Sequence, residues 1–566
     1  MPVSRDPPTP GEIEKWFLDV APAPEQTFEF ALVLGGTVSA GAYTAGAVDF
    51  LIEAMDCFAK AQGTEDAPPH KAVLKFIAGT SGGGVNAAIA ARALAFDYPH
   101  IVRSTQLTSQ PSGNPFYDVW VNTLRLDGFL KTEDVKSSLT SLLNGKPIDD
   151  GAALIVAYGN DKQPIARPWV GDPLRVILTV TNLCGVPYET SLGGSNSQVY
   201  VDHADYAKFA FVYPKRTLTE PRPDEQVLSF LNERLPSGIS WDDFSEFARA
   251  TAAFPLGFPA RALERPTQHY RWRVVPYPAG PGGASTYLVR TPSWKRMIPD
   301  GGNEVPEEWH FLSVDGGATD NEPIELARTS LVGLLNRNPR EGDAANRAVW
   351  LIDPFAGRAA LGPSGNATFV SELGAIVTTL TQQTRYDTAD ILMAADPNIF
   401  SRFMLSPTRG SVSGEDAIAS GGLGAFIGFA CQDFMRFDYF LGRANCQQFL
   451  CTQFLLKEDN PVFAGWSPEQ RARFASPTNP GMLPIIPLCG DAAIDEVLEV
   501  WPKGKLKPEV YRTAIEARFR AILELELSGS IGKNILGWVG AHATQKDLAD
   551  HVIAAMNAYL TKANLI

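Results

Sequence analysis

Ser81 stands at the centre of a short motif that suits nucleophilic catalysis. The pentapeptide Gly79-Thr80-Ser81-Gly82-Gly83 fits the pattern G-x-S-x-G, follows an apolar run at residues 73–78 and precedes an Ala-rich run at residues 85–95. A strand, a sharp turn and a helix are therefore predicted, with flanking glycines that leave the serine hydroxyl accessible. The helix N-terminus beneath the serine favours the negative charge that develops during acyl transfer. An inert serine in a structural turn is the alternative interpretation, and the strand–helix context favours the nucleophile.

A second glycine-rich turn has the sequence Gly35-Gly36-Thr37-Val38-Ser39-Ala40-Gly41. It follows the apolar run at residues 30–34 and precedes a helical pattern at residues 42–58. Backbone N–H groups in such a turn can stabilise an oxyanion. Because the carboxyl ends of parallel strands share one edge of a sheet, we expect the two turns to face each other. A dinucleotide-binding turn is the competing interpretation, although Val38 breaks the G-x-G-x-x-G spacing that it requires.

Asp315 is the candidate base. It follows the apolar run at residues 311–314 and begins the turn Asp315-Gly316-Gly317, which places a carboxylate at the same edge of the predicted sheet. Taken alone, an acidic residue before glycine is more often a turn former than a catalytic group. The motif therefore gains meaning only in combination with the other two.

Together and in this order, the three motifs resemble those of the patatin-like phospholipase family, particularly its bacterial members. The family's first motif reads G-G-G-G-x-[KR]-G-A-Y-x-A-G, and residues 35–46 follow its spacing throughout. The family's G-T-S-G-G and D-G-[AG] motifs match the turns at Ser81 and Asp315, and residues 248–255 and 436–443 look like two further family segments. The resemblance covers residues 29–355 well and is looser beyond them.

This resemblance implies a serine acyl hydrolase that cleaves fatty acyl esters of phospholipids or neutral lipids. Ser81 would form an acyl-enzyme and Asp315 would take its proton, so that a Ser-Asp dyad needs no histidine. His542 and His551 follow Asp315 in the order that a Ser-acid-His triad requires, which keeps a triad open as an alternative. Both histidines fall in a predicted helical stretch, whereas a triad histidine usually lies on a loop, and this favours the dyad.

The first turn also departs from the family pattern. Thr37 and Val38 stand where the family usually has glycine, and Ala40 stands where it usually has Lys or Arg. Backbone amides remain available, and one well-placed donor is worth about 10²–10³ in rate. Two alternatives therefore stay open: a lipid-binding scaffold with weak or no catalysis, and a dinucleotide-dependent oxidoreductase.

The elements that must position these residues indicate an α/β fold. Strand patterns at residues 30–34, 73–78, 175–181, 311–314 and 348–352 alternate with helical patterns, which predicts a mainly parallel sheet. By resemblance, this is a patatin-like core of three layers. We expect three units: a mobile N-terminal extension (1–28), an acyl hydrolase domain (29–355) and a mainly helical C-terminal region (356–566), and we interpret residues 99–173 and 187–240 as irregular insertions. The helices expected in the C-terminal region span residues 369–398, 426–456, 507–525 and 544–562.

The composition of the chain narrows the classes of molecule that it is expected to bind. Among 566 residues, 49 Lys and Arg oppose 63 Asp and Glu, and the formal charge of −14 disfavours nucleic acid and favours neutral or zwitterionic lipid. Six scattered cysteines without ligand spacing predict no metal, and we expect no cofactor. The sequence shows neither a signal peptide nor a transmembrane run, so we expect a cytoplasmic protein, with peripheral attachment to a membrane left open. Apolar stretches at residues 421–430 and 531–539 could contact a bilayer, but core packing is favoured for both.

Overall fold

A computed structural model provides the structure of this chain. It describes residues 3–18, 20–102, 111–191, 197–213, 218, 221–235, 238–277, 286–334, 339, 341–356, 384, 402–528 and 545–566.

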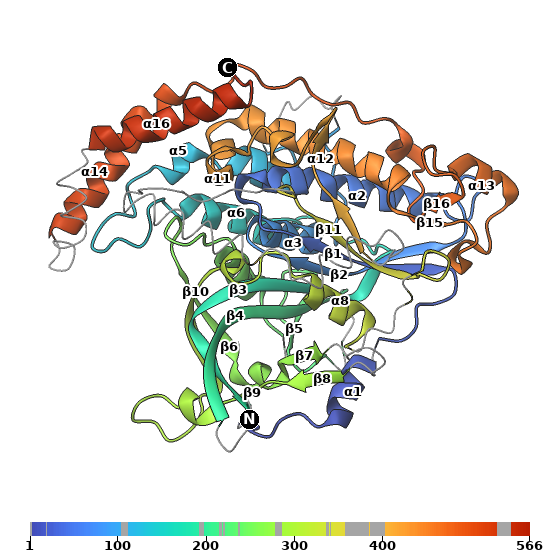
Figure 1. The fold of residues 1–566 in the computed structure, drawn as a ribbon, viewed down its shortest axis with the longest axis horizontal. Coiled ribbons are helices and arrows are strands. Elements are labelled where there is room, and N and C mark those ends of the chain that lie inside the picture. The colour runs from blue at the N-terminus through green and yellow to red at the C-terminus, as the bar shows by residue number, and fades with distance from the viewer. Residues whose placement is uncertain are drawn as a thin grey trace.

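A ten-stranded sheet forms the centre of the molecule (Figure 1). Its parallel part runs in the order β12 (Arg402–Leu405), β11 (Arg347–Ile352), β1 (Thr27–Leu34), β2 (Lys71–Gly79) and β3 (Val170–Ser191). The antiparallel strands β10 (Glu308–Asp315) and β6 (Arg261–Pro266) continue it beyond β3. Strand β4 (Ser197–Val212) also pairs with β3, and it carries β5 (Glu225–Ser229), while β9 (Thr291–Pro292) pairs with β3 as well. The mainly parallel α/β sheet predicted from the sequence is confirmed.

Alternate side chains of the parallel strands enter two different cores. In β1, Phe30 and Leu32 pack in the larger core beneath α2 (Gly41–Ala61) and α12 (Gln432–Thr452). The intervening Ala31 and Val33 pack on the opposite face with α8 (Ile324–Val332). Burying both faces explains why β1 reads as a continuous apolar run. Each large aliphatic side chain buried in this way stabilises the fold by roughly 1.5–3 kcal/mol. The sheet therefore lies between two helical layers, as the three-layer prediction required.

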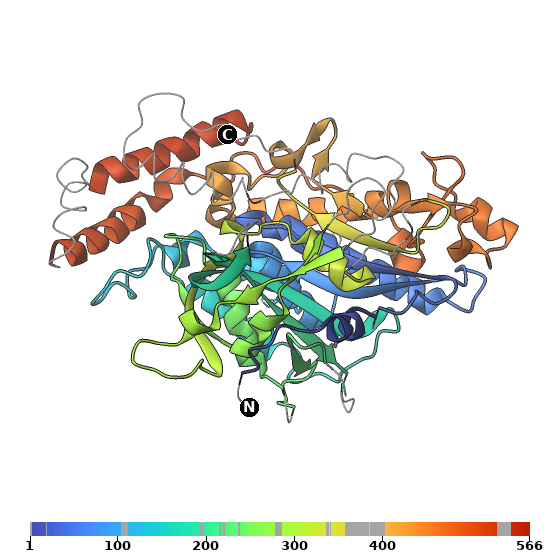
Figure 2. The ribbon, with the colours of Figure 1, turned by 60° about the horizontal axis from the view of Figure 1, so that its bottom comes forward.

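The remaining elements surround this sheet. The helices are α3 (Gly82–Ala93), α4 (Pro115–Tyr117), α5 (Leu126–Phe129), α6 (Lys146–Ala157), α7 (Trp241–Thr251), α11 (Gly422–Ala425), α13 (Pro468–Phe474), α14 (Arg512–Ser528) and α16 (Gln545–Lys562). Short ribbons are formed by β7 (Val274–Tyr277) with β8 (Thr286–Val289), β13 (Thr408–Arg409) with β14 (Val412–Ser413), and β15 (Leu455–Lys457) with β16 (Met482–Pro484). Figure 2 shows α14 and α16 lying side by side and projecting from the body of the molecule.

The sheet and its helical layer both extend past residue 355, where we expected one unit to end. Strand β12 comes from the C-terminal region and pairs with β11 in parallel. Helix α12 joins α2 through a buried ion pair in which Arg443 Nη1 lies 2.5 Å from Asp49 Oδ2. A boundary at 355/356 therefore divides the sequence but not the sheet. The predicted helix at residues 369–398 lies outside the described residues.

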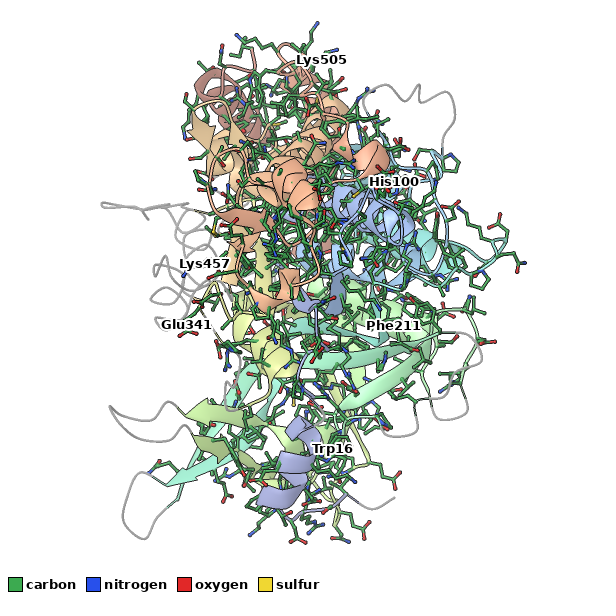
Figure 3. The ribbon with its side chains drawn as sticks, turned by 90° about the vertical axis from the view of Figure 1, so that its right-hand side faces the viewer. Trp16, His100, Phe211, Glu341, Lys457 and Lys505 are labelled. Carbon is green, nitrogen blue, oxygen red and sulfur yellow. The ribbon has the colours of Figure 1, made fainter. Side chains whose placement is uncertain are left out.

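The N-terminal segment is packed rather than free. Residues 10–18 form α1 (Pro10–Leu18), whose Ile13 is buried and whose Trp16 meets Trp272 edge to face at 5.8 Å between ring centroids. The indole nitrogen of Trp294 donates a hydrogen bond to the backbone oxygen of Arg5 at 2.9 Å. Figure 3 shows Trp16 against the end of the molecule that holds β7 and β8. In residues 3–18, where we expected a mobile extension, aromatic and apolar side chains among the prolines have partners in the rest of the chain.

Candidate active site

The turn between β2 and α3 places Ser81 in a conformation that few residues adopt. Its φ is 54° and its ψ is −130°, in a region where a side chain is strained. The turn also passes close to β1: a Cβ added to Gly83 would lie 2.1 Å from the backbone oxygen of Leu34. Glycine is therefore required at this point, as the G-x-S-x-G motif predicted.

Hydrogen bonds from three directions fix this turn. Thr251 of α7 accepts a bond from the backbone N–H of Ser81 through its Oγ1 at 2.9 Å, and Thr80 N–H donates to Leu34 O at 3.1 Å. The hydroxyl oxygens of Thr80 and Thr179 lie 2.6 Å apart. Strands β1 and β3 and helix α7 thus hold the serine, which explains how so strained a backbone persists.

Asp315 lies at the carboxyl end of β10, directly across from Ser81. The Ser81 hydroxyl donates a hydrogen bond to Asp315 Oδ2 at 2.6 Å, and the Gly317 N–H donates to Oδ1 at 2.8 Å. The backbone of Asp315 is held as well, because its N–H donates to Ala253 O and its carbonyl accepts from Thr181 Oγ1, both at 2.8 Å. Ser81 is 7% exposed and Asp315 is 3% exposed, so the pair is largely screened from water.

Burial changes the acidity of Asp315. Removal from water raises the pKa of its carboxyl from 3.8 to about 7, although the bonds from Ser81 and Gly317 favour the charged form. No Lys or Arg forms an ion pair with this carboxylate in the described part of the chain. A base with a pKa near neutrality takes up a proton readily and is still ionised at pH 7–8, which suits general base catalysis.

The first glycine turn offers fewer free amides than its sequence suggested. The N–H groups of Gly35 and Gly36 donate to Ile352 O at 3.2 Å and to Asn321 O at 3.3 Å. The N–H of Gly41 also donates, to the backbone oxygens of Val38 and Ser39 within the turn. These amides are therefore not available to an oxyanion, nor to the pyrophosphate of a dinucleotide.

Val38 is the member of this turn that faces the candidate nucleophile. It has φ 47°, which is uncommon for a β-branched residue, and it lines the same pocket as Ser81 and Gly82. Its N–H donates to no residue that the structure describes. Gly82 is the first residue of α3, so its N–H has no partner within the helix. The amides of Val38 and Gly82 are thus available beside Ser81.

The C-terminal region covers the rest of the turn. Ala40, where the family usually carries a cation, is fully buried. Next to it, the Ser39 hydroxyl donates a hydrogen bond to the backbone oxygen of Ala425 in α11. Thr37 is also fully buried, and its hydroxyl has no hydrogen-bond partner among the described residues. Residues 420–430 therefore pack against this turn.

An apolar pocket begins at Ser81. Its empty volume, including the part open to solvent, is about 600 Å³. Helices α6 and α7 form its sides with residues such as Ile155 and Ala248, and phenylalanines from several loops close it. The polar members of the lining are Ser81, Arg249 and the Trp120 indole, so a hydrocarbon chain would fit its surface.

No histidine that the structure describes hydrogen-bonds to Ser81 or Asp315. His551 is exposed on α16, and its Nδ1 lies 2.6 Å from the backbone oxygen of Asp547 one turn away. His542 lies outside the described residues. Across the described ranges, no three His, Cys, Asp or Glu side chains are arranged to hold a metal ion, and no helix is long and apolar enough to span a membrane.

The family model described as patatin-like phospholipase matches residues 32–328, more than half of the chain. This chain belongs to the patatin-like phospholipase family. An uncharacterized protein of Sinorhizobium fredii is 30% identical over 528 residues, which cover 84% of this chain and 73% of that protein. The solved structure of VipD from Legionella pneumophila aligns with 74% of this chain and 67% of its own, at 10% identity and a TM-score of 0.17, too low to bear on the fold. For this patatin-like phospholipase, the family points to a lipid acyl hydrolase.

Enlarging Gly41 should damage this site from the side of the pocket. A Cβ at this position would lie 2.0 Å from the ring of Trp120, a pocket-lining residue. We expect Gly41→Val to lower kcat/KM for a soluble ester about 100-fold, because small displacements of a site are costly, and to destabilise the protein by about 1–3 kcal/mol. Gly11→Val is the matched control, because nothing lies within 4 Å of its Cβ position. Equal activities of the two variants would show that the turn does not shape the site.

Proposed function

We propose that this protein hydrolyses fatty acyl esters of phospholipids or neutral lipids, with Ser81 as nucleophile and Asp315 as base. The observation that carries the proposal is the 2.6 Å hydrogen bond from Ser81 Oγ to Asp315 Oδ2 at the wall of an apolar pocket. A nucleophile within hydrogen-bond reach of a base is the arrangement that acyl transfer needs. The hydrolase unit that we propose, residues 29–355, is completed by β12 and α12 from the C-terminal region.

In the first half-reaction, Ser81 Oγ attacks the ester carbonyl carbon while the Asp315 carboxylate takes the hydroxyl proton. The tetrahedral intermediate then collapses, the bond to the alcohol breaks, and Asp315 returns the proton to the departing oxygen. In the second half-reaction, water attacks the acyl-enzyme and gives a proton to Asp315. The bond to Ser81 breaks, the fatty acid leaves, and the proton returns to Ser81.

The oxyanion needs donors where its charge develops. In our proposal these are the N–H groups of Val38 and Gly82, which flank Ser81 and have no partner within the described residues. The N-terminal end of α3 adds a favourable dipole. Gly35, Gly36 and Gly41 shape this turn instead of donating to substrate, since their amides are already bonded. An oxyanion site of this kind does not need the cation that Ala40 replaces.

The pKa of Asp315 sets the expected pH dependence. Only the carboxylate can accept the Ser81 proton, and the pKa of this group is about 7. We expect kcat/KM for a soluble ester to rise about tenfold per pH unit below pH 7 and to level off above it. Initial rates of p-nitrophenyl ester hydrolysis, corrected for spontaneous hydrolysis, measure the profile. A profile that is already flat from pH 5 to 8 would contradict a base with this pKa.

A further inference from the structure

Two exposed leucines lie in left-handed backbone conformations near the pocket. Leu256 has φ 64° and is 52% exposed, and Leu423 has φ 54° and is 37% exposed. Bulky residues seldom occupy this conformation, which is strained and persists mainly where function uses it. Here the strained backbone presents apolar side chains to solvent, so packing within the chain does not account for them.

The segments that carry these leucines also wall the pocket. Phe254 and Phe258 flank Leu256 in the sequence and line the pocket. Phe429, from the segment that carries Leu423, lines it too. The intervening Phe426 has its ring centroid 5.4 Å from that of Phe254 and 6.1 Å from that of Phe258. These ring contacts bring the segments that carry Leu256 and Leu423 together at the phenylalanine-lined wall of the pocket.

A third exposed leucine extends this surface. Leu142 is 46% exposed, and its backbone N–H donates a hydrogen bond to Leu256 O at 2.9 Å. The two residues are therefore neighbours, although neither belongs to a β-strand. We call Leu142, Leu256 and Leu423 the leucine rim. Figure 1 shows α5 and α6 on the same side of the molecule as α14, whose Arg518 bonds to Leu142.

Two ion pairs lie on the segments next to the leucine rim. Arg518 of α14 donates to Leu142 O at 3.0 Å and is paired with Asp134. On the side of Leu423, Lys562 of α16 lies 3.8 Å from Asp416. Each of these two pairs is neutral, and the chain as a whole carries −14. This balance suits a neutral or zwitterionic lipid surface and disfavours an anionic one.

We propose that the leucine rim docks this protein onto a neutral or zwitterionic lipid surface, with the pocket facing the lipid. The inference rests on the proposed function, because it gives the acyl chain a dry path from the lipid phase to Ser81. Apolar side chains that enter the headgroup boundary gain the free energy of leaving water. The left-handed turns at Leu256 and Leu423 serve to hold those side chains outward before contact.

The test replaces both strained leucines with asparagine, which is polar and tolerates left-handed backbone. In the full-length chain with Ser81→Ala, we expect Leu256→Asn with Leu423→Asn to weaken binding to phosphatidylcholine vesicles at least about tenfold in a flotation assay. Leu312→Asn is the matched control, because Leu312 is 54% exposed on β10, outside the rim, and binding should be unchanged. With Ser81 intact, the ratio of vesicle to soluble-ester turnover should fall by a similar factor.

Unchanged vesicle binding by the double asparagine variant would overturn the inference, as would a parent protein that does not bind phosphatidylcholine vesicles. A dimer that the same substitutions dissociate, seen by light scattering, would assign the rim to a second copy of the chain and also overturn it. Binding that needs phosphatidylglycerol in the vesicle would contradict the neutral-surface claim. If the binding loss appears but the parent hydrolyses no ester, the proposed function fails while the docking surface stands.

Discussion

Replacing Ser81 with alanine is expected to lower kcat for p-nitrophenyl acyl esters at least about 10⁴-fold. The acyl group would have no oxygen to bond to, and Asp315 would lack the proton donor that lies 2.6 Å away. The fold should survive, because alanine fits the same turn and the lost hydroxyl makes one hydrogen bond. The melting temperature should therefore shift by only a few degrees.

Ser313→Ala is the matched control for this experiment. Ser313 is fully buried on β10, two residues before Asp315. Among the residues that the structure describes, its hydroxyl bonds only to the neighbouring backbone oxygen of Val314, at 3.3 Å. Its turnover should stay within a few-fold of the parent value. Retained turnover in Ser81→Ala, measured with protein free of contaminating esterase, would remove Ser81 from the mechanism.

Changing Asp315 to asparagine should lower kcat about 10³–10⁴-fold, because the amide keeps the shape of the carboxylate but cannot accept the Ser81 proton. The residual rate should also lose the rise with pH that the parent shows below pH 7. His551→Ala should remain near the parent value, since His551 bonds to its own helix. A folded but inactive His551→Ala or His542→Ala protein would favour a triad instead.

The same substitution has an expected effect on stability. The pKa of Asp315 is about 7 in the folded protein and near 3.8 when exposed, so the folded state binds this proton more tightly than the unfolded state. The stability linked to this proton is complete below about pH 4 and is lost as the pH rises through 7. Asp315→Asn carries no buried charge, so its free energy of unfolding should exceed that of the parent above pH 7. Chemical denaturation at pH 4.5 and pH 8 measures the difference.

The turns of the candidate site were predictable because each depends on local sequence. Glycines beside Ser81 and a carboxylate at the end of a strand mark turns that only certain residues allow, and the resemblance joined them into one site. The structure adds the contact between Ser81 and Asp315, 234 positions apart, and the free amide of Val38. Neither follows from spacing, because hydrogen-bond partners depend on how the strands are ordered in the sheet.

Other parts of the fold depend on distant contacts and were missed. Residues 187–240, interpreted as an irregular insertion, contain β4 and β5, whose many polar side chains hide the strand pattern. The order comes from pairing, because β4 pairs with β3 and β5 pairs with β4. Strand β12 is four residues long and gains its place only by pairing with β11. The stretch at residues 421–430 was expected to be buried, and it largely is, but Leu423 is exposed.

The most direct test of the central claim is covalent labelling by a fluorophosphonate, followed by mass spectrometry of the modified peptide. Our account predicts a single phosphonyl group on Ser81, no labelling of Ser81→Ala, and labelling of Asp315→Asn that is slower by orders of magnitude. Labelling should also accelerate as the pH rises toward 7, because it requires the Asp315 carboxylate. A folded protein that is not labelled would indicate a lipid-binding scaffold, and an adduct on any residue other than Ser81 would contradict the assignment of the nucleophile.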